Sequence, residues 1–234
     1  MTPLSTLGMS GPVSTLSATS VPSYITSDLV LNLDAGDNSS YGGSGTTWTD
    51  LSGEGNNGTI SGATHTSGAG GYFDFDGTND YVSFSSYSQP AYSSSSTFTW
   101  SVWVYPVANS NNPIIGNRGT DLNFTKLTSN NFEYYTSNFG NFFKFGGTMT
   151  LNEWQNICIT KNGTSFTYYK NGSSIATSTS SIAKPSRPFF IGGDNTTSTE
   201  FSDHRIAIVM VYTAALTASE VAQNFNAFKG RYGL

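Results

Sequence analysis

The sequence predicts an all-β sandwich or barrel that follows an extended N-terminal arm and ends in one short helix. After residue 28, short runs rich in β-branched and aromatic residues alternate with Gly, Asn and Asp turn signals. Charged residues make up only 11% of the 234 residues, and Ser, Thr and Asn take their place, as a fold with many polar turns requires. Near the C-terminus, a capping-box pattern precedes apolar residues at helical spacing.

Residues 1–27 are expected to form an arm and the rest one domain, 28–234. Ser, Thr, Pro and Gly dominate the arm, and its apolar residues follow neither a helical nor a strand period. The arm carries no charge before Asp28, so we expect it to dock on other proteins through apolar and backbone contacts. Its expected anchors are Leu4, Leu7, Met9, Val13, Leu16 and Val21.

The strands of the domain are expected to be short and numerous. Thr97–Tyr105 shows the clearest alternation, with Phe98 and Trp100 on one face and Trp103 on the other, so both faces should be covered. Arg205–Tyr212 is apolar on both faces and should be central. The other expected strands are Leu29–Leu33, Tyr72–Phe75, Tyr81–Phe84, one at Phe124, Phe132–Thr136, Phe142–Phe145, Trp154–Lys161, Phe166–Lys170 and Phe189–Ile191.

Thr217 and Glu220 predict the start of the single helix. They occupy the N-cap and N3 positions of a capping box, in which each side chain bonds the backbone of the other residue. Val221 and Phe225 follow at helical spacing and should pack on the sandwich. Gly230 is expected to end the helix.

Composition excludes several classes of protein. The pI of about 4.8 and the absence of Lys and Arg before Arg118 argue against nucleic acid as a partner. We expect no membrane insertion, because no apolar run approaches the length of a membrane span. The N-terminus lacks the pattern of a secretory signal. Cys158, the single cysteine, excludes an internal disulfide and should be a buried, inert thiol.

The chain resembles the laminin-G-like jelly rolls of the concanavalin A-like lectin and glucanase superfamily. The order and spacing of several segments over about 28–234 carry this resemblance. They are Leu31–Gly36, Trp48–Gly53, Asn56–Gly58, Phe75–Val82, Phe98–Val104, Trp154 with Ile157, Tyr168–Gly172, Ile191–Gly193, Ile206–Tyr212 and Leu216–Phe225. The ending, Phe225–Gly233, is similar to versions in structural proteins of tailed bacteriophages. The resemblance implies a concanavalin A-like jelly-roll sandwich, often carbohydrate-binding, and a place in a virion.

No catalytic residues are expected. Glucanases of this superfamily need two carboxylates across the glycosidic bond, but no two of the five Glu residues lie within ten residues of each other. Asp74 and Asp76 share a strand face, yet they adjoin a turn, where Asp usually bonds the backbone. His65 and His204 are expected at exposed loop or edge positions.

Calcium is the one cofactor that the residues suggest. Hard cations take carboxylate and amide oxygens, and such residues stand near several expected strand ends. The candidate ligands are Asp34, Asp76, Asn79, Asp80 and Asp194. Many relatives carry an acidic residue where this chain has Ala207, so the metal site of the family is not fully present here. The competing interpretation is that these side chains cap turns.

A candidate glycan site lies in the aromatic-rich segment 130–147. Glycan recognition combines aromatic faces with neighbouring amide or carboxylate groups, and the candidate residues are Tyr134, Tyr135, Asn138, Phe139 and Asn141. Alternation sends about half of the aromatic side chains of this segment inward. The other interpretation is therefore that most of them pack in the core.

These observations favour a non-enzymatic virion protein, located in the head or the tail of the particle. The arm would bind other virion proteins, and the jelly roll would be displayed in several copies, as a homo-oligomer on the particle, to touch cell-surface glycans. Two alternatives stay open at this point. One is a free carbohydrate-binding lectin, and the other is a structural decoration without a ligand.

Overall fold

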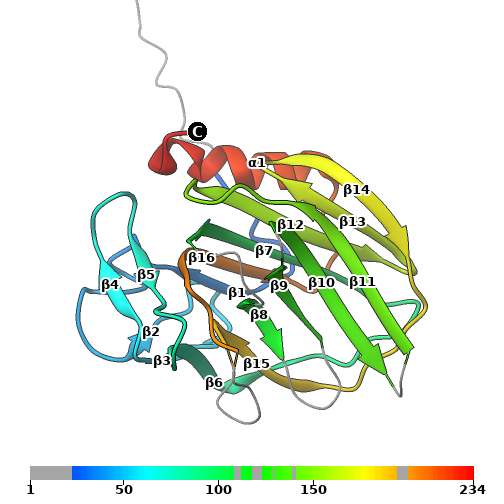
Figure 1. Cartoon of the computed structure of the whole chain (residues 1–234), viewed down its shortest axis with the longest axis horizontal. Helices are drawn as coiled ribbons and strands as arrows, with labels where there is room; N and C mark the ends of the chain where they lie inside the picture. Colours follow the sequence, from blue (N-terminus) through cyan, green and yellow to red (C-terminus); the bar gives the residue numbers. More distant parts are fainter. Residues whose placement is uncertain (1–22, 108–111, 118–122, 129, 139–140, 194–199) are drawn as a thin grey trace, which may run out of the picture.

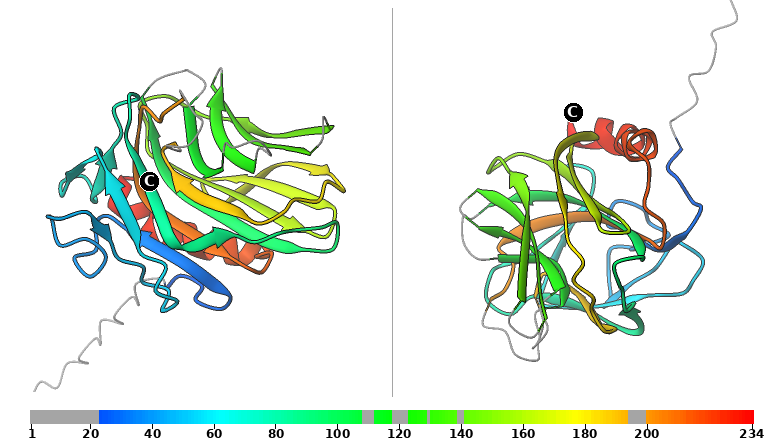
Figure 2. Two further views of the ribbon diagram at one scale, coloured as in Figure 1. Left: turned by 90° about the horizontal axis from the view of Figure 1, so that it is seen from below. Right: turned by 90° about the vertical axis from the view of Figure 1, so that its right-hand side faces the viewer.

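The structure is a computed structural model, and it describes residues 23–107, 112–117, 123–128, 130–138, 141–193 and 200–234. Two antiparallel sheets lie face to face as a sandwich, and one helix covers the outer side of one of them (Figures 1 and 2). The fold class predicted from the sequence is confirmed. No helix among the described residues has the length and apolar character needed to cross a membrane.

Sheet A has the strand order β14-β13-β12-β7-β16-β5-β4, and β1 also pairs with β16. Its members are β1 (Leu29–Asp34), β4 (Thr64–Thr66), β5 (Tyr72–Asp74), β7 (Thr97–Pro106), β12 (Gln155–Asn162), β13 (Ser165–Lys170), β14 (Ser173–Thr179) and β16 (His204–Tyr212). Along one side of β16, the first residues pair with β5 and the later ones with β1. The expected central position of this strand is confirmed.

Sheet B has the order β11-β10-β9-β8-β15-β6-β3-β2. Its members are β2 (Thr47–Trp48), β3 (Gly58–Ser61), β6 (Tyr81–Gln89), β8 (Asn112–Asn117), β9 (Asn123–Thr128), β10 (Asn131–Asn138), β11 (Asn141–Thr148) and β15 (Arg187–Ile191). Each expected strand has a counterpart, within a few residues of its predicted bounds. The strands that were not predicted are β2, β3, β4, β8 and β14. In β2 and β4, two or three residues give no readable alternation.

The main core fills the space between the sheets and is strongly aromatic. The inward side chains of β7 include Trp100, Val102 and Val104, as the alternation predicts. Trp100 packs edge-on against Tyr134 of β10 and Phe189 of β15, with ring centroids 5.8 and 5.7 Å apart. Rings from both sheets therefore interlock, and this fixes the spacing of the two layers.

A second apolar cluster lies on the outer face of sheet A, under α1 (Ala218–Phe228). The helix starts at the predicted capping box, in which the Glu220 amide donates to Thr217 Oγ1. Trp103 of β7 stacks on Phe225, and on Tyr232 of the 3-10 helix η1 (Lys229–Tyr232). Covering this face explains how β7 and β16 can be apolar on both sides.

Both boundaries of the domain differ in part from the prediction. The α-helix ends before Gly230 as expected, with Lys229 as its C-cap, but the chain continues into η1, and the left-handed residue that ends this segment is Gly233 (φ 74°). The domain also begins before residue 28. Tyr24 stacks on Phe228, and the backbone amide of Ile25 donates to Asn224 Oδ1 of α1. The last residues of the expected arm therefore belong to the domain.

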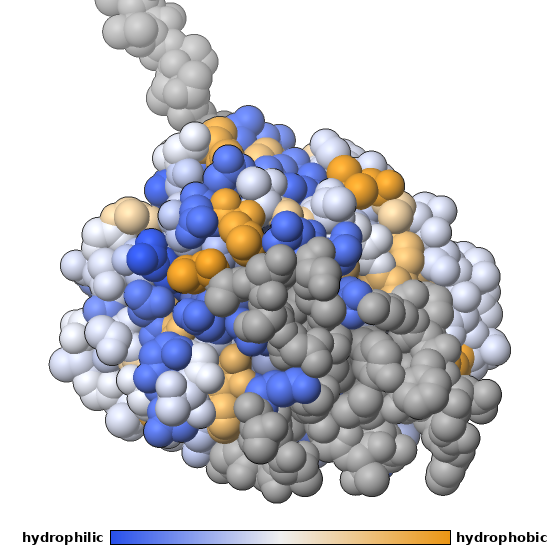
Figure 3. Space-filling view, in the orientation of Figure 1, coloured by the Kyte–Doolittle hydropathy of each residue, from blue (hydrophilic) through white to orange (hydrophobic). Residues whose placement is uncertain are grey.

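The exposed surface is mostly polar. The large hydrophobic side chains exposed among the described residues are Val107, Ile175 and Leu234, and they lie on different elements. In Figure 3, hydrophobic residues form small separate patches on the coloured part of the visible face. Solubility therefore depends on Ser, Thr and Asn side chains as much as on charges.

An ion pair joins the end of β1 to η1. Both terminal nitrogens of Arg231 donate to the carboxylate of Asp34, at 2.6 and 2.7 Å, and Arg231 also donates to the Gly70 carbonyl oxygen. The Asp34 side chain is 8% exposed. Removal of the guanidinium would leave a nearly buried carboxylate without its counter-ion, which costs far more than the loss of a surface ion pair.

We expect Arg231→Ala to lower the free energy of unfolding by about 3 kcal/mol, because it leaves the nearly buried Asp34 carboxyl group without its ion-pair partner. Chemical denaturation at neutral pH measures this change. Lys229→Ala is the matched control, since it removes a cation from the same short helix without disturbing Asp34, and it should cost less than about 1 kcal/mol. Equal losses in the two variants would contradict the role of the ion pair.

His204 provides a pH-dependent contribution to stability. It is fully buried at the start of β16, where Nδ1 accepts a long hydrogen bond (3.4 Å) from the backbone amide of Val107. Burial lowers the pKa of His204 to about 4. The expected exposed position of this residue is wrong. His204 lies within β16 and pairs with Pro106 of β7, a pairing between distant segments that the local sequence does not show.

Because the unfolded chain takes up this proton near pH 6.5 and the folded chain near pH 4, stability should fall as the pH drops between these values. The loss should reach about 3 kcal/mol at its largest. His204→Asn keeps an acceptor near Nδ1 but does not titrate, so the dependence of its unfolding free energy on pH should be flatter by this amount. Parallel pH profiles for the two proteins would disprove this.

Candidate functional site

The structure brings few of the predicted site residues together. Tyr134 is fully buried, and its hydroxyl lies 2.6 Å from that of Tyr92, so its expected role at a glycan-binding surface is wrong. It belongs to the half of the aromatic side chains that alternation sends inward. Phe139 and the side chains of Tyr135, Asn138 and Asn141 lie outside what the structure describes. Asp194 and the six arm residues from Leu4 to Val21 also lie outside it.

The candidate calcium ligands serve other roles where they are described. Asp34 binds Arg231, Asp76 Oδ1 accepts the Thr78 amide in a turn, and buried Asp80 accepts the amide of Asp76. Asn79 is exposed. Within the described part of the chain, no three His, Cys, Asp or Glu side chains are placed to hold a metal ion. Calcium binding stays a prediction.

A row of polar and aromatic side chains crosses one end of sheet A. The register places Arg205 of β16 directly between Asp74 of β5 and Tyr105 of β7. Trp154 immediately precedes β12 and extends the row beyond Tyr105. Tyr72 lies two residues before Asp74 and so shares its face of the sheet. This is the outer face, because Trp103, two residues before Tyr105, packs under α1 and η1.

The aromatic rings of this row form a half-buried platform. Trp154 lies 5.6 Å from both Tyr72 and Tyr105, measured between ring centroids, and its other side packs on Tyr232 at 4.7 Å. Tyr232, the last residue of η1, thus covers Trp103 and one part of Trp154, and the side chains of the row are half-buried. We call Tyr72, Asp74, Tyr105, Trp154 and Arg205 the outer platform.

The rings hold Arg205 in place. Its guanidinium carbon lies 4.8 Å from the ring centroid of Tyr105 and 5.3 Å from that of Tyr72, a cation–π arrangement. Arg205 Nε is 3.6 Å from Asp74 Oδ2, with 35% and 45% of the two side chains exposed. No hydrogen bond fixes this guanidinium among the described residues, so donors on Arg205 and acceptors on Asp74 are available to a ligand.

Further carboxylates surround the platform. Burial raises the pKa of Asp203, and the charges of Asp74 and Asp76 raise it further. Burial likewise raises the pKa of Asp80, with smaller contributions from Asp76 and Asp74. This end of sheet A thus carries more negative than positive charge. Its field favours neutral ligands over anionic ones.

Sequence reasoning did not find this platform. The sequence places Tyr105 on the second face of the expected strand Thr97–Tyr105, and Asp74 on a strand face that adjoins a turn. The neighbouring strands are far apart in the sequence, and only the pairing of β5, β16 and β7 brings the residues into one row.

The remaining predicted groups are not arranged for catalysis. Cys158 is buried in β12, and burial raises the pKa of its thiol well above the usual range, so it is not a nucleophile. His65 Nε2 is bonded to the carbonyl oxygen of Ala35 in the edge region of sheet A. Asp76 and Asp80 are occupied by the backbone of a turn.

The chain belongs to the concanavalin A-like lectin/glucanases superfamily. The family model with this description, of the laminin G type, matches residues 76–222, which is more than half of the chain. The resemblance noted from the sequence is thereby confirmed for the family and the fold. A comparison with curated protein sequences finds no match.

Solved structures with the same fold include the binding domains of clostridial toxins. The binding domain of botulinum neurotoxin DC in complex with rat synaptotagmin II has a TM-score of 0.69 and 17% identity, over 87% of this chain and 52% of that chain. The binding domain of Paraclostridial Mosquitocidal Protein 1 has a TM-score of 0.67 and 20% identity, over 87% and 53%.

A third structure, the binding domain of botulinum neurotoxin DC in complex with SialylT, has a TM-score of 0.67 and 15% identity, over 87% of this chain and 52% of that chain. At these identities the likeness concerns the fold. This chain spans about half the length of the structures that it resembles.

Proposed function

We propose that this chain is a non-catalytic carbohydrate-binding domain that binds neutral glycans at the outer platform. The observation that carries the proposal is the row Asp74–Arg205–Tyr105–Trp154, in which half-buried rings lie beside an ion pair whose donors and acceptors are not used in hydrogen bonds among the described residues. Membership of a superfamily that contains lectins supports it. The toxin binding domains support it only through their fold.

The platform matches the two sides of a sugar. The C–H face of a pyranose ring is apolar and would stack on Trp154 or Tyr105, where burial of aromatic surface provides the attraction. The ring hydroxyls at the edge of the sugar would accept hydrogen bonds from Arg205 and donate to Asp74. Bonds to charged groups are stronger than neutral ones, so this pair would orient the ring.

The surrounding carboxylates define the preferred glycan. The charges of Asp74 and Asp76 add to the effect of burial in raising the pKa of Asp203, and Arg205 already balances one of these charges. A sialylated or uronic-acid glycan would add a further negative charge to this group. We therefore expect neutral hexose glycans to bind better than acidic ones.

Binding without hydrolysis follows from the same residues. Glycoside hydrolysis needs two carboxyl groups across the scissile bond, one of them free to protonate the leaving oxygen. Asp74 is paired with Arg205, Asp76 bonds the turn, and Asp80 is buried under it. The virion location, attachment by the arm and display as a homo-oligomer stay predictions from the sequence, and residues 1–22 lie outside the described structure.

We expect Trp154→Ala and Arg205→Gln each to weaken binding to neutral glycans about tenfold, because one removes the stacking surface and the other the hydrogen-bond donors. A glycan array with the domain displayed multivalently identifies the ligand, since single sites of this kind are weak. Titration calorimetry with that glycan then compares the variants.

Arg187→Gln is the matched control, because it makes the same exchange on β15 of the other sheet and should bind like the unaltered chain. The proposal would be abandoned if the folded, multivalent chain bound no neutral glycan. It would also be abandoned if both platform variants bound the identified glycan with unchanged affinity.

A further inference from the structure

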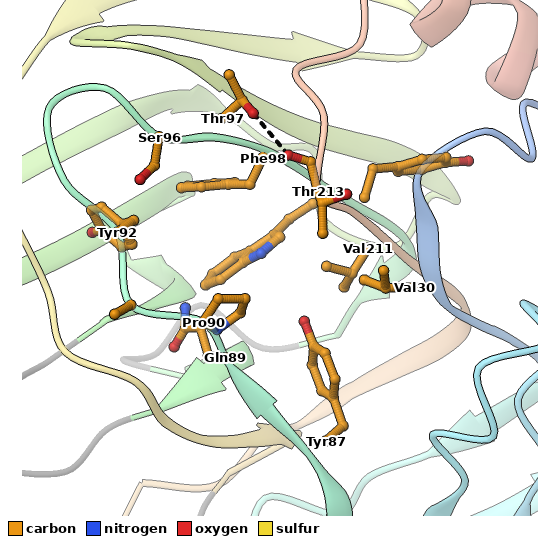
Figure 4. Close-up of a pocket in the computed structure, with 13 residues that line it drawn as sticks. Val30, Tyr87, Gln89, Pro90, Tyr92, Ser96, Thr97, Phe98, Val211 and Thr213 are labelled. Atoms are coloured by element: carbon orange, nitrogen blue, oxygen red, sulfur yellow. Dashed lines mark hydrogen bonds between the residues drawn. The ribbon is translucent and has the colours of Figure 1, made fainter.

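A cavity of about 280 Å³ opens at one end of the sandwich, between the two sheets and away from the outer platform residues (Figure 4). It is formed by the ends of β1, β6, β7 and β16 and by the loop after β6. The lining residues are Val30, Tyr87, Gln89, Pro90, Ala91, Tyr92, Ser96, Thr97, Phe98, Trp100, Val211, Tyr212 and Thr213. None of them is charged, and most are apolar or aromatic.

Two buried polar side chains in this cavity have no hydrogen-bond partner. Gln89 is 2% exposed, and neither its amide oxygen nor its amide nitrogen is bonded to any described residue. Tyr87 is 7% exposed, and its hydroxyl is also unbonded. In Figure 4, the ring of Tyr87 projects between Gln89 and Val211, with its hydroxyl towards the interior of the group of lining residues.

Such groups are rare in native proteins, because a buried donor or acceptor without a partner is destabilising. The backbone of Gln89 does have a hydrogen-bond partner, since its carbonyl oxygen accepts a hydrogen bond from the Ser186 hydroxyl at 2.9 Å. Only the side chains that face the cavity are unsatisfied here. A molecule that fills the cavity can supply the partners that these side chains lack.

Hydrogen bonds hold the walls of the cavity in place. The ammonium group of Lys161 is fully buried and donates to the carbonyl oxygens of Ser93, Ser96 and Gly163, which holds the loop after β6 against sheet A. Tyr92 and Lys184 exchange both backbone hydrogen bonds, at 2.9 and 2.8 Å. A pocket whose rim is fixed in this way needs little reorganisation to accept a ligand.

A hydrogen bond also fixes the wall formed by β7 and β16. Thr97 Oγ1 donates to the carbonyl oxygen of Thr213 at 2.8 Å, and this bond joins the start of β7 to the end of β16 (Figure 4). Pro90, Ala91 and Thr97 are exposed and form the mouth, whereas Trp100 is buried. The cavity therefore has a mouth towards solvent, with the buried polar groups behind it.

We propose that this cavity binds a neutral small molecule that joins a ring-sized apolar body to one carboxamide or hydroxyl group. The apolar walls take the body, and the carboxamide of Gln89 offers one donor and one acceptor side by side. A primary amide pairs with both, and Tyr87 offers a third bond. An anion or cation would meet no charged side chain in the lining among the described residues, and the ammonium group of Lys161 behind the wall is already bonded to three carbonyl oxygens.

Benzamide, benzoate and toluene test this proposal, because they share one ring and differ only in the group attached to it. Ligand-observed nuclear magnetic resonance at millimolar concentrations, followed by titration, measures their affinities for the full chain. We expect benzamide to bind at least tenfold more tightly than benzoate and toluene. Absence of benzamide binding, or equal binding of benzamide and benzoate, would overturn the proposal.

Two nearly isosteric variants test the polar groups. Tyr87→Phe and Gln89→Met should each weaken benzamide binding about tenfold and leave toluene binding unchanged. Neither should lower the melting temperature of the free chain, because each removes a buried group that has no partner. Unchanged benzamide affinity in both variants, or a clear loss of stability in both, would contradict a ligand-facing role.

This site is independent of the proposed glycan site. Trp154→Ala should leave benzamide binding unchanged, and Gln89→Met should leave glycan binding unchanged. If the two sites failed together in either variant, a general loss of folding would be the cause, and circular dichroism of the variants detects that. If glycan binding failed alone, the cavity would still bind benzamide.

Discussion

The burial of β16 on both faces is the constraint on which the rest of this structure depends. Its inner side chains join the core between the sheets, and its outer ones, such as Ile208 and Met210, need a cover of their own. The helix α1 and the short helix η1 supply that cover, but they are shorter than the sheet is wide. The outer face of sheet A continues beyond Tyr232, the last residue of η1, and the platform lies on that part of the face.

The two proposed binding sites differ in their electrostatics. At the platform, a half-buried arginine is held by rings beside several carboxylates, so neighbouring charges would select the ligand. In the cavity, no lining residue is charged and the polar atoms are few, so shape and hydrogen-bond pairing decide. A sandwich supplies both environments, since its outer faces meet water and its ends open between the layers.

The sequence supports the fold much better than the sites. Alternation in Thr97–Pro106, the capping box at Thr217 and the turn at Asp76 depend on neighbouring residues, and the structure confirms all three. Tyr134 was misjudged because alternation does not say which face is the inner one. The platform and the cavity depend on pairings between strands far apart in the sequence, and no local pattern encodes those.

The contacts between the two ends of the described chain have a mechanical consequence. Tyr24 and Ile25 pack on α1, and the chain then enters β1. This strand pairs antiparallel with the later residues of β16, from Ile208 to Tyr212. A pull on the chain at residue 23 would therefore act first on these contacts with α1 and then on the hydrogen bonds between β1 and β16. A domain held by its N-terminus would thus transmit force directly to β16, the strand that organises its core.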